Sequence, residues 1–260
     1  MMKLFFPFLL LHFLAVLGLG CQPQAQREAE TAPPEPPFRQ LLVVLTADWD
    51  TAHGTLQRFV WQREGWRTEG GAIPVIIGRN GLGWGRGVAD FTDLTGPVKQ
   101  EGDLKSPAGI FRLGTAFGYA PASEADFVQF AYTPVIASTM CIEDTASAAY
   151  NRIIDETAAS PDWNSTDHML RDDDLYEWGM LVEHNYETAQ PGGGSCIFLH
   201  VWRGPQGNGT AGCTSMNKRK MKDLLAWLDP AQSPALVQVP RNEYARLQQH
   251  YDLPAEDQIK

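Results

Sequence analysis

The sequence predicts a single, mostly β domain with a few flanking helices, an α+β fold whose strands pack as a sandwich. Three observations carry this prediction. Short runs rich in Val, Ile and Leu recur along the chain, turns containing glycine and proline separate them, and helical periodicity is confined to three short segments. Strands are expected at residues 40–46, 55–63, 66–68, 73–77, 110–113, 179–183, 195–202 and 236–239.

The first strands of the domain are predicted to form a hairpin. Residues 40–46 are a continuous apolar run, residues 55–63 alternate, and a turn at Glu64 and Gly65 leads into 66–68. After the strand at 73–77, the four glycines within the eight residues 80–87 predict a loop that lines a cleft. No Walker lysine follows this loop, so the pattern does not favour a phosphate-binding loop.

Three segments have helical character. Residues 147–157 place aromatic and β-branched side chains on one face. Residues 217–227 carry apolar side chains at i, i+3, i+4 and i+7 spacing and end before Pro230, which predicts an amphipathic helix. A last short helix is expected at 242–250.

Composition excludes some classes of protein. A hydrophobic content of 43%, with eight Trp and twelve Phe, is enough for a sizeable core. The formal net charge of −10 argues against a nucleic-acid partner, because no basic stripe is present to neutralise phosphates. Nothing in the sequence demands more than a monomer.

The N-terminal residues are typical of an exported protein. Residues 1–20 combine a basic start with a short apolar run, which predicts a signal peptide. Small residues before Cys21 resemble a bacterial lipoprotein cleavage site, so we expect a lipid on Cys21 and a membrane contact through that anchor alone. Residues 21–38 are polar and rich in proline, which predicts a disordered tether. The folded domain is then expected at 39–260, in the periplasm or cell envelope.

Chemistry is concentrated between His200 and Met216. A histidine closes an apolar strand, a glycine-rich loop follows, and Cys213 stands just ahead of the helix expected from residue 217. A helix N-terminus and a nearby histidine both lower a thiol pKa, and the small Gly212 lets a substrate carbonyl approach the backbone. Backbone N–H groups of Cys213 and Thr214 are then candidates to hold an oxyanion. From spacing alone, a buried structural cysteine and a surface histidine remain open alternatives.

The same segment resembles the L,D-transpeptidase (YkuD-type) catalytic domain. That family has a strand-end His, a glycine-containing loop and Ser/Thr-His-Gly-Cys, which His200, Thr210, Gly212 and Cys213 match here. The upstream residues 105–112 are similar to its Thr-Pro-x-Gly-x-Phe segment. The resemblance implies a β-sandwich domain that acts on peptidoglycan stem peptides without a cofactor: the cysteine attacks the bond between meso-diaminopimelate and D-Ala, and the acyl group passes to an amine or water.

The sequence departs from that pattern at Ala211, where the motif has a second histidine. Transpeptidation remains the main hypothesis. A carboxypeptidase or endopeptidase of the same fold, an inactive peptidoglycan-binding lipoprotein and a thiol-redox protein are the alternatives.

Further residues are candidates for supporting roles. Arg203 is expected to pair with a substrate carboxylate, His184 to supply the imidazole missing at Ala211, and Thr210 and Trp202 to contact substrate. Three cysteines follow Cys21, and Cys141 and Cys196 are candidates for a disulfide that leaves Cys213 free, although the sequence does not show that they meet. No C-x-x-C spacing occurs, and no metal site is expected.

Overall fold

In the computed structural model, which describes residues 1–2, 36–63, 65–158 and 160–259, strands from the two ends of the domain pair at its centre. Strand β1 (Gln40–Thr46) runs parallel to β13 (Ala235–Pro240), with Leu41 opposite Ala235. Every residue of both strands is buried. This explains the continuous apolar run at 40–46, because a strand covered on both faces needs no polar alternation.

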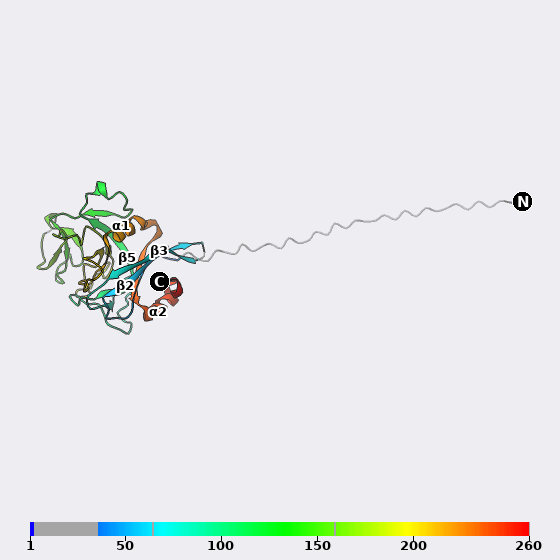
Figure 1. Cartoon of the computed structure of the whole chain (residues 1–260), viewed down its shortest axis with the longest axis horizontal. Coiled ribbons are helices and arrows are strands. Elements are labelled where there is room, and N and C mark those ends of the chain that lie inside the picture. Colours follow the sequence, from blue (N-terminus) through cyan, green and yellow to red (C-terminus); the bar gives the residue numbers. More distant parts are fainter. Residues whose placement is uncertain (3–35, 64, 159, 260) are drawn as a thin grey trace. The chain divides into compact units, whose positions relative to one another are not determined.

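The remaining strands extend this pair into one sheet that closes on itself. Within the described residues, ten strands form the sheet, in the order β10-β11-β12-β3-β2-β1-β13-β5-β4, with β6 beside β5. A second pairing joins β10 to β5, with Gly179 opposite Phe117, and closes the sheet into a barrel-like sandwich core. The predicted mostly β fold is therefore confirmed (Figure 1). The strands not yet given are β2 (His53–Gln62), β3 (Gly65–Ile76), β4 (Leu82–Trp84), β5 (Ser106–Gly118), β6 (Tyr132–Pro134), β10 (Trp178–Val182), β11 (Phe198–Val201) and β12 (Thr214–Met216).

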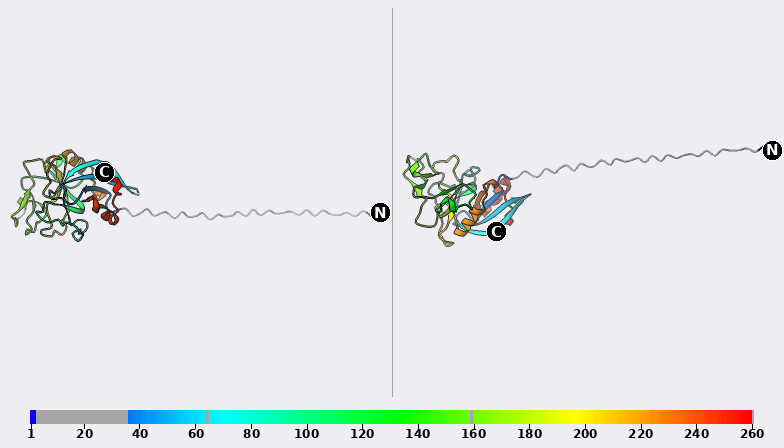
Figure 2. Two further views of the ribbon diagram at one scale, coloured as in Figure 1. Left: turned by 60° about the horizontal axis from the view of Figure 1, so that its bottom comes forward. Right: turned by 90° about the horizontal axis from the view of Figure 1, so that it is seen from above.

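Two α-helices cover the sheet. Helix α1 (Lys218–Trp227) begins after Asn217, whose side chain accepts hydrogen bonds from two backbone N–H groups of the first turn, and packs on β10 and β11. Helix α2 (Arg241–Tyr251) packs on β13 and β1, and the turned views of Figure 2 show it in orange to red beside these strands. Both helices begin and end within one residue of their predicted bounds. Short 3-10 turns lie at Ala122–Glu124, Glu156–Ala158, Pro230–Gln232 and Glu256–Gln258.

A small antiparallel sheet lies in the long excursion between β5 and β10. It consists of β7 (Thr139–Ile142) flanked by β8 (Ile153–Asp155) and β9 (Thr166–His168). The disulfide between Cys141 and Cys196 links β7 to the segment just before β11, with an S–S distance of 2.06 Å.

The helix predicted at 147–157 is wrong. Residues 148–151 form turns, and β8 follows at Ile153. The physical reason is Asn151, which has a φ of 61° and whose side chain donates to the carbonyls of His184 and Asn185 and accepts from Cys196 N–H. These contacts come from residues far along the chain, and they outweigh the local helical pattern.

The predictions for the signal peptide, Cys21 and most of the tether lie outside the described residues. The chain divides into the units Met1–Pro33 and Pro34–Lys260, and the second contains all the elements above. Among the helices of the described residues, none has the length and apolar character needed to cross a membrane.

Candidate active site

Cys213 and His200 line one cavity because their strands are neighbours. Strands β11 and β12 run parallel, with His200 opposite Ser215, and Cys213 immediately precedes β12. Cys213 is 7% exposed and His200 is 5% exposed, and both line a cavity of about 430 Å³. Predicted residues that also line it are Thr210, Trp202 and Arg203.

The loop before Cys213 is held in shape by its own hydroxyl and a glycine. The Thr210 hydroxyl donates to the Cys213 carbonyl over 2.6 Å and accepts from Gly212 N–H over 3.1 Å. Gly212 has a φ of 154°, and a Cβ there would lie 3.1 Å from the carbonyl oxygen of Lys105. Thr210 therefore shapes the loop with its hydroxyl, and Gly212 lets the backbone of Lys105 pack closely against the loop. The predicted approach of a substrate carbonyl at Gly212 stays a prediction.

Ser106 contacts this loop through its side chain, and the sequence alone did not reveal this role. Its buried hydroxyl accepts from Gly78 N–H over 2.8 Å and donates to the Gly212 carbonyl over 2.6 Å. The signal was available, because Ser106 opens the Ser-Pro-Ala-Gly-Ile-Phe segment that carries part of the family resemblance.

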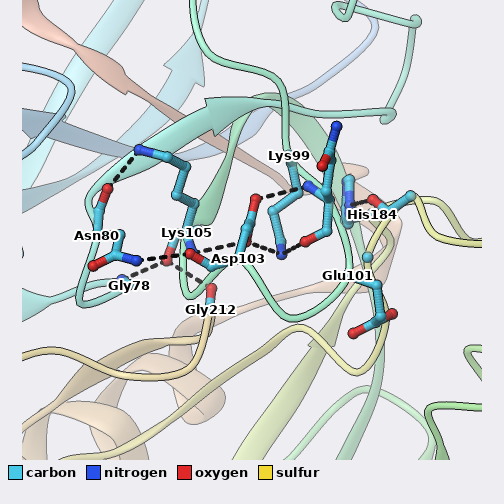
Figure 3. A network of polar contacts seen from close by, with 12 residues as sticks. Gly78, Asn80, Lys99, Glu101, Asp103, Lys105, His184 and Gly212 are labelled. Atoms are coloured by element: carbon cyan, nitrogen blue, oxygen red, sulfur yellow. Dashed lines mark hydrogen bonds and ion pairs between the residues drawn. The ribbon is translucent and has the colours of Figure 1, made fainter.

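A polar network around Asp103 fixes the turn that leads to Ser106. The Asp103 carboxylate accepts from Lys99 Nζ over 2.6 Å and from Lys105 N–H over 2.8 Å. Lys105 Nζ in turn donates to the Asn80 carbonyl over 2.7 Å, and Figure 3 shows these side chains converging beside Gly78 and Gly212. The network thus connects the glycine-rich loop at 80–87 to the backbone before the nucleophile.

The Cys213 thiol is protonated in this environment. Its Sγ donates to the Cys196 carbonyl over 3.4 Å and accepts from Phe198 N–H over 3.3 Å. Burial raises the pKa of the thiol to about 12, and the carboxylates of Asp167 and Glu143 act in the same direction. The expectation of a pKa lowered by a helix N-terminus is therefore wrong: β12 intervenes, and α1 begins only at Lys218.

A hydrogen bond of the His200 ring shows which of its two nitrogens carries the proton. Nδ1 lies 2.7 Å from the Val201 carbonyl oxygen, and because a carbonyl only accepts, Nδ1 carries the proton. Burial lowers the pKa of His200 to about 4, so the ring is neutral near pH 7 and Nε2 is an acceptor. Across the described residues no hydrogen bond joins this ring to Cys213, and the two groups meet as neighbours in the cavity.

Tyr176 is a second residue that the sequence did not reveal. Its buried ring packs edge-on against His200, with 5.4 Å between ring centroids, and it lines the cavity. Its hydroxyl donates to Asp167 Oδ2 over 2.5 Å. Tyr176 thus holds one face of the imidazole, and its own position is fixed by the small sheet through Asp167 on β9.

Three predicted residues lie away from the cavity or have their charge balanced. His184 is buried, accepts from Arg86 N–H at Nδ1 and donates from Nε2 to the Gly193 carbonyl, so its position does not supply the imidazole missing at Ala211. The Thr214 hydroxyl donates to Gln238 Oε1 in the sheet, which leaves only its backbone for a catalytic role. Arg203 lines the cavity but pairs with Asp173 over 2.6 Å.

A protonated thiol and a neutral imidazole at the ends of two paired strands, in a closed β sheet, define a candidate thiol-nucleophile site. The model of the L,D-transpeptidase catalytic domain (YkuD) matches residues 50–239, which include both groups. This chain belongs to the YkuD family.

Other comparisons are more distant. The solved structure of Bd1075 from Bdellovibrio bacteriovorus is similar over 83% of this chain, with 14% sequence identity and a TM-score of 0.39. This chain spans 59% of the length of that chain. Among curated proteins, no sequence matches this one.

Proposed function

We propose that this protein is an exported peptidoglycan L,D-transpeptidase that works through a Cys213 acyl-enzyme on stem tetrapeptides. The observation that carries the proposal is the shared cavity of Cys213 and His200 within a chain of the YkuD family. Export by the N-terminal residues and a lipid on Cys21 complete the proposal, since the substrate lies in the cell wall.

The mechanism follows from the protonation states. His200 Nε2 accepts the Cys213 proton as the sulfur attacks the carbonyl carbon of the third stem residue. Backbone N–H groups at Cys213 and Thr214 stabilise the oxyanion. The tetrahedral intermediate collapses, the C–N bond breaks, and D-Ala leaves as an amine that takes the proton from the imidazolium. An amine acceptor or water then attacks the thioester and regenerates the thiol.

Because both groups rest in their neutral forms, proton transfer accompanies the attack on the bound substrate rather than preceding it. Burial disfavours the thiolate and the imidazolium alike, so an ion pair is not the resting state. The proton moves from the Cys213 sulfur to His200 Nε2 only when substrate occupies the cavity between them.

Intact-protein mass spectrometry of residues 38–260 with a synthetic tetrapeptide tests the acyl-enzyme. We expect one adduct, equal in mass to the tetrapeptide less D-Ala, that is absent in Cys213→Ala and formed at least about a hundredfold more slowly in His200→Ala. The variant His184→Gln is the matched control, because His184 is also a buried histidine but does not line the cavity. An adduct that survives in Cys213→Ala would contradict the proposal.

The products distinguish transpeptidation from hydrolysis. Dimers formed from disaccharide-tetrapeptide support the transpeptidase, whereas trimmed monomers alone would make the protein an L,D-carboxypeptidase with the same acyl-enzyme. Neither adduct nor product, together with binding to sacculi, would replace both with the peptidoglycan-binding lipoprotein.

A further inference from the structure

In the part of the chain that the structure describes, the cavity of Cys213 is lined by basic and not by acidic side chains, although the protein as a whole is acidic. Among the described residues that line it, three are arginines and none is aspartate or glutamate. The whole chain, in contrast, has a formal net charge of −10. A second cavity of comparable size, lined by residues of 86–90 and 183–190, contains both signs of charge. The cavity of the proposed nucleophile thus differs from this second cavity in having arginines but no carboxylate among the described residues of its lining.

Two of the three arginines are already paired. Arg203 lies 2.6 Å from a carboxylate oxygen of Asp173, and Arg171 lies 3.3 Å from Asp173 and 3.4 Å from Asp167. Neither Asp173 nor Asp167 lines the cavity, so these carboxylates contact the two guanidinium groups from outside it. Their charge is largely balanced within the protein.

Arg79 is different. Its side chain is exposed and forms no ion pair or hydrogen bond with another of the described residues. Its backbone, however, is fixed: Arg79 N–H donates to the Thr210 carbonyl over 2.9 Å, and the adjacent Gly78 forms a bridge to Thr210. The close approach of Gly209, where a Cβ would lie 2.2 Å from Arg79 Cα, holds the two loops together. An unpaired guanidinium thus projects from backbone that is anchored beside the nucleophile loop.

We propose that Arg79 binds the free C-terminal carboxylate of the substrate and makes it a requirement for recognition. This inference rests on the proposed function. A guanidinium presents paired donors that match a carboxylate, and this geometry gives short, charge-assisted hydrogen bonds. In a peptide cleaved before its last residue, the terminal carboxylate is one residue from the attacked carbonyl, where consecutive Cα atoms are about 3.8 Å apart. Arg79 is anchored to Thr210, three positions before Cys213, and lines the same cavity, so we assign it to this carboxylate.

A binding experiment tests this proposal independently of turnover. The ligands are the tetrapeptide with a free C-terminal carboxylate and the same peptide with a C-terminal carboxamide, which keeps every other carboxylate. Calorimetric titrations use residues 38–260 carrying Cys213→Ala, alone and combined with Arg79→Gln. The matched control is Arg67→Gln, because Arg67 is an exposed arginine of β3 outside the cavity, and its loss changes the net charge equally.

We expect the acid to bind at least about tenfold more tightly than the amide, and Arg79→Gln to abolish this preference while leaving amide binding unchanged. Arg67→Gln should change neither affinity. Three outcomes would each overturn the proposal. The protein that retains Arg79 could bind acid and amide equally, it could fail to bind the acid, or the preference for the acid could survive Arg79→Gln. An equal loss for both peptides would also overturn it, by assigning Arg79 to another carboxylate. Release of D-Ala by the chain with Cys213 intact reports separately on the proposed function.

Discussion

The thiol of Cys213 donates a hydrogen bond of 3.4 Å to the backbone carbonyl of Cys196, whose own sulfur is bonded to Cys141. The proposed nucleophile is therefore in direct contact with the residue through which the small sheet is tied to the barrel. Cys196 has a φ of 55°, in the left-handed region that a residue with a side chain rarely adopts. The contact suggests that the disulfide stabilises both the fold and the position of the sulfur.

Removal of the disulfide is expected to destabilise the domain. The bond closes a loop with a sequence separation of 55 residues, and Cys141→Ser with Cys196→Ser should lower the free energy of unfolding by about 2–4 kcal/mol. Urea unfolding with and without a reducing agent measures this. The reductant should lower the midpoint of the unmodified protein and leave the double variant unaffected. Equal midpoints without reductant would contradict the expectation.

The reactivity of Cys213 should follow a raised pKa. With the pKa at about 12, the thiolate fraction rises about tenfold per pH unit over the range from 7 to 10. Alkylation by iodoacetamide, followed by intact mass, should accelerate in the same proportion. In the protein of residues 38–260, Cys213→Ser should remain unlabelled, because Cys141 and Cys196 are bonded to each other. A labelling rate that reaches its plateau below pH 8 would indicate a thiolate–imidazolium pair instead.

Acid should destabilise the protein through two buried histidines. Burial lowers the pKa values of His184 and His200 from 6.5 to about 4. Above pH 6.5 both rings are neutral in the folded and unfolded chain, and their contribution is fully present. As the pH falls from 6.5 to 4, only the unfolded chain gains protons, so each histidine lowers the free energy of unfolding by about 1.4 kcal/mol per pH unit.

The slope of stability against pH in this window measures the effect. Relative to the unmodified protein, His184→Gln should remove about 1.4 kcal/mol per pH unit from the slope, whatever its effect on absolute stability. His200→Gln should act equally. Identical slopes in all three proteins would show that the histidines do not titrate as their burial requires.

Loss of the Ser106 hydroxyl should disturb the nucleophile loop. Ser106→Ala leaves Gly78 N–H and the Gly212 carbonyl without their buried partner, at a cost of about 1–3 kcal/mol. Alkylation of Cys213 should change in rate as the loop relaxes. Thr68→Ala, which removes an exposed hydroxyl that donates to the Gln258 carbonyl, is the control and should leave both properties unchanged. Equal stability of the two variants would remove Ser106 from this role.

The local sequence pattern was sufficient to predict an element where the burial of its side chains follows that pattern. The run at 40–46 and the spacing at 217–227 each gave the correct element, since burial on both faces or along one stripe leaves a direct pattern. At 147–157 the same reasoning failed, because Asn151 bonds to His184, Asn185 and Cys196, which are distant in sequence. Ser106 and Tyr176 escaped notice for a related reason: their partners at the site are brought together only by the fold.

The sequence by itself determined the groups available for chemistry, the mostly β class and the family to which the chain belongs. Tertiary structure decided which cysteines are bonded, which arginine remains unpaired in the cavity, and that the thiol and imidazole rest in neutral forms. The physical reason is the distance along the chain over which each effect acts. Periodicity and residue type act over a few neighbours, whereas pairing and desolvation depend on groups that meet only when the sheet closes.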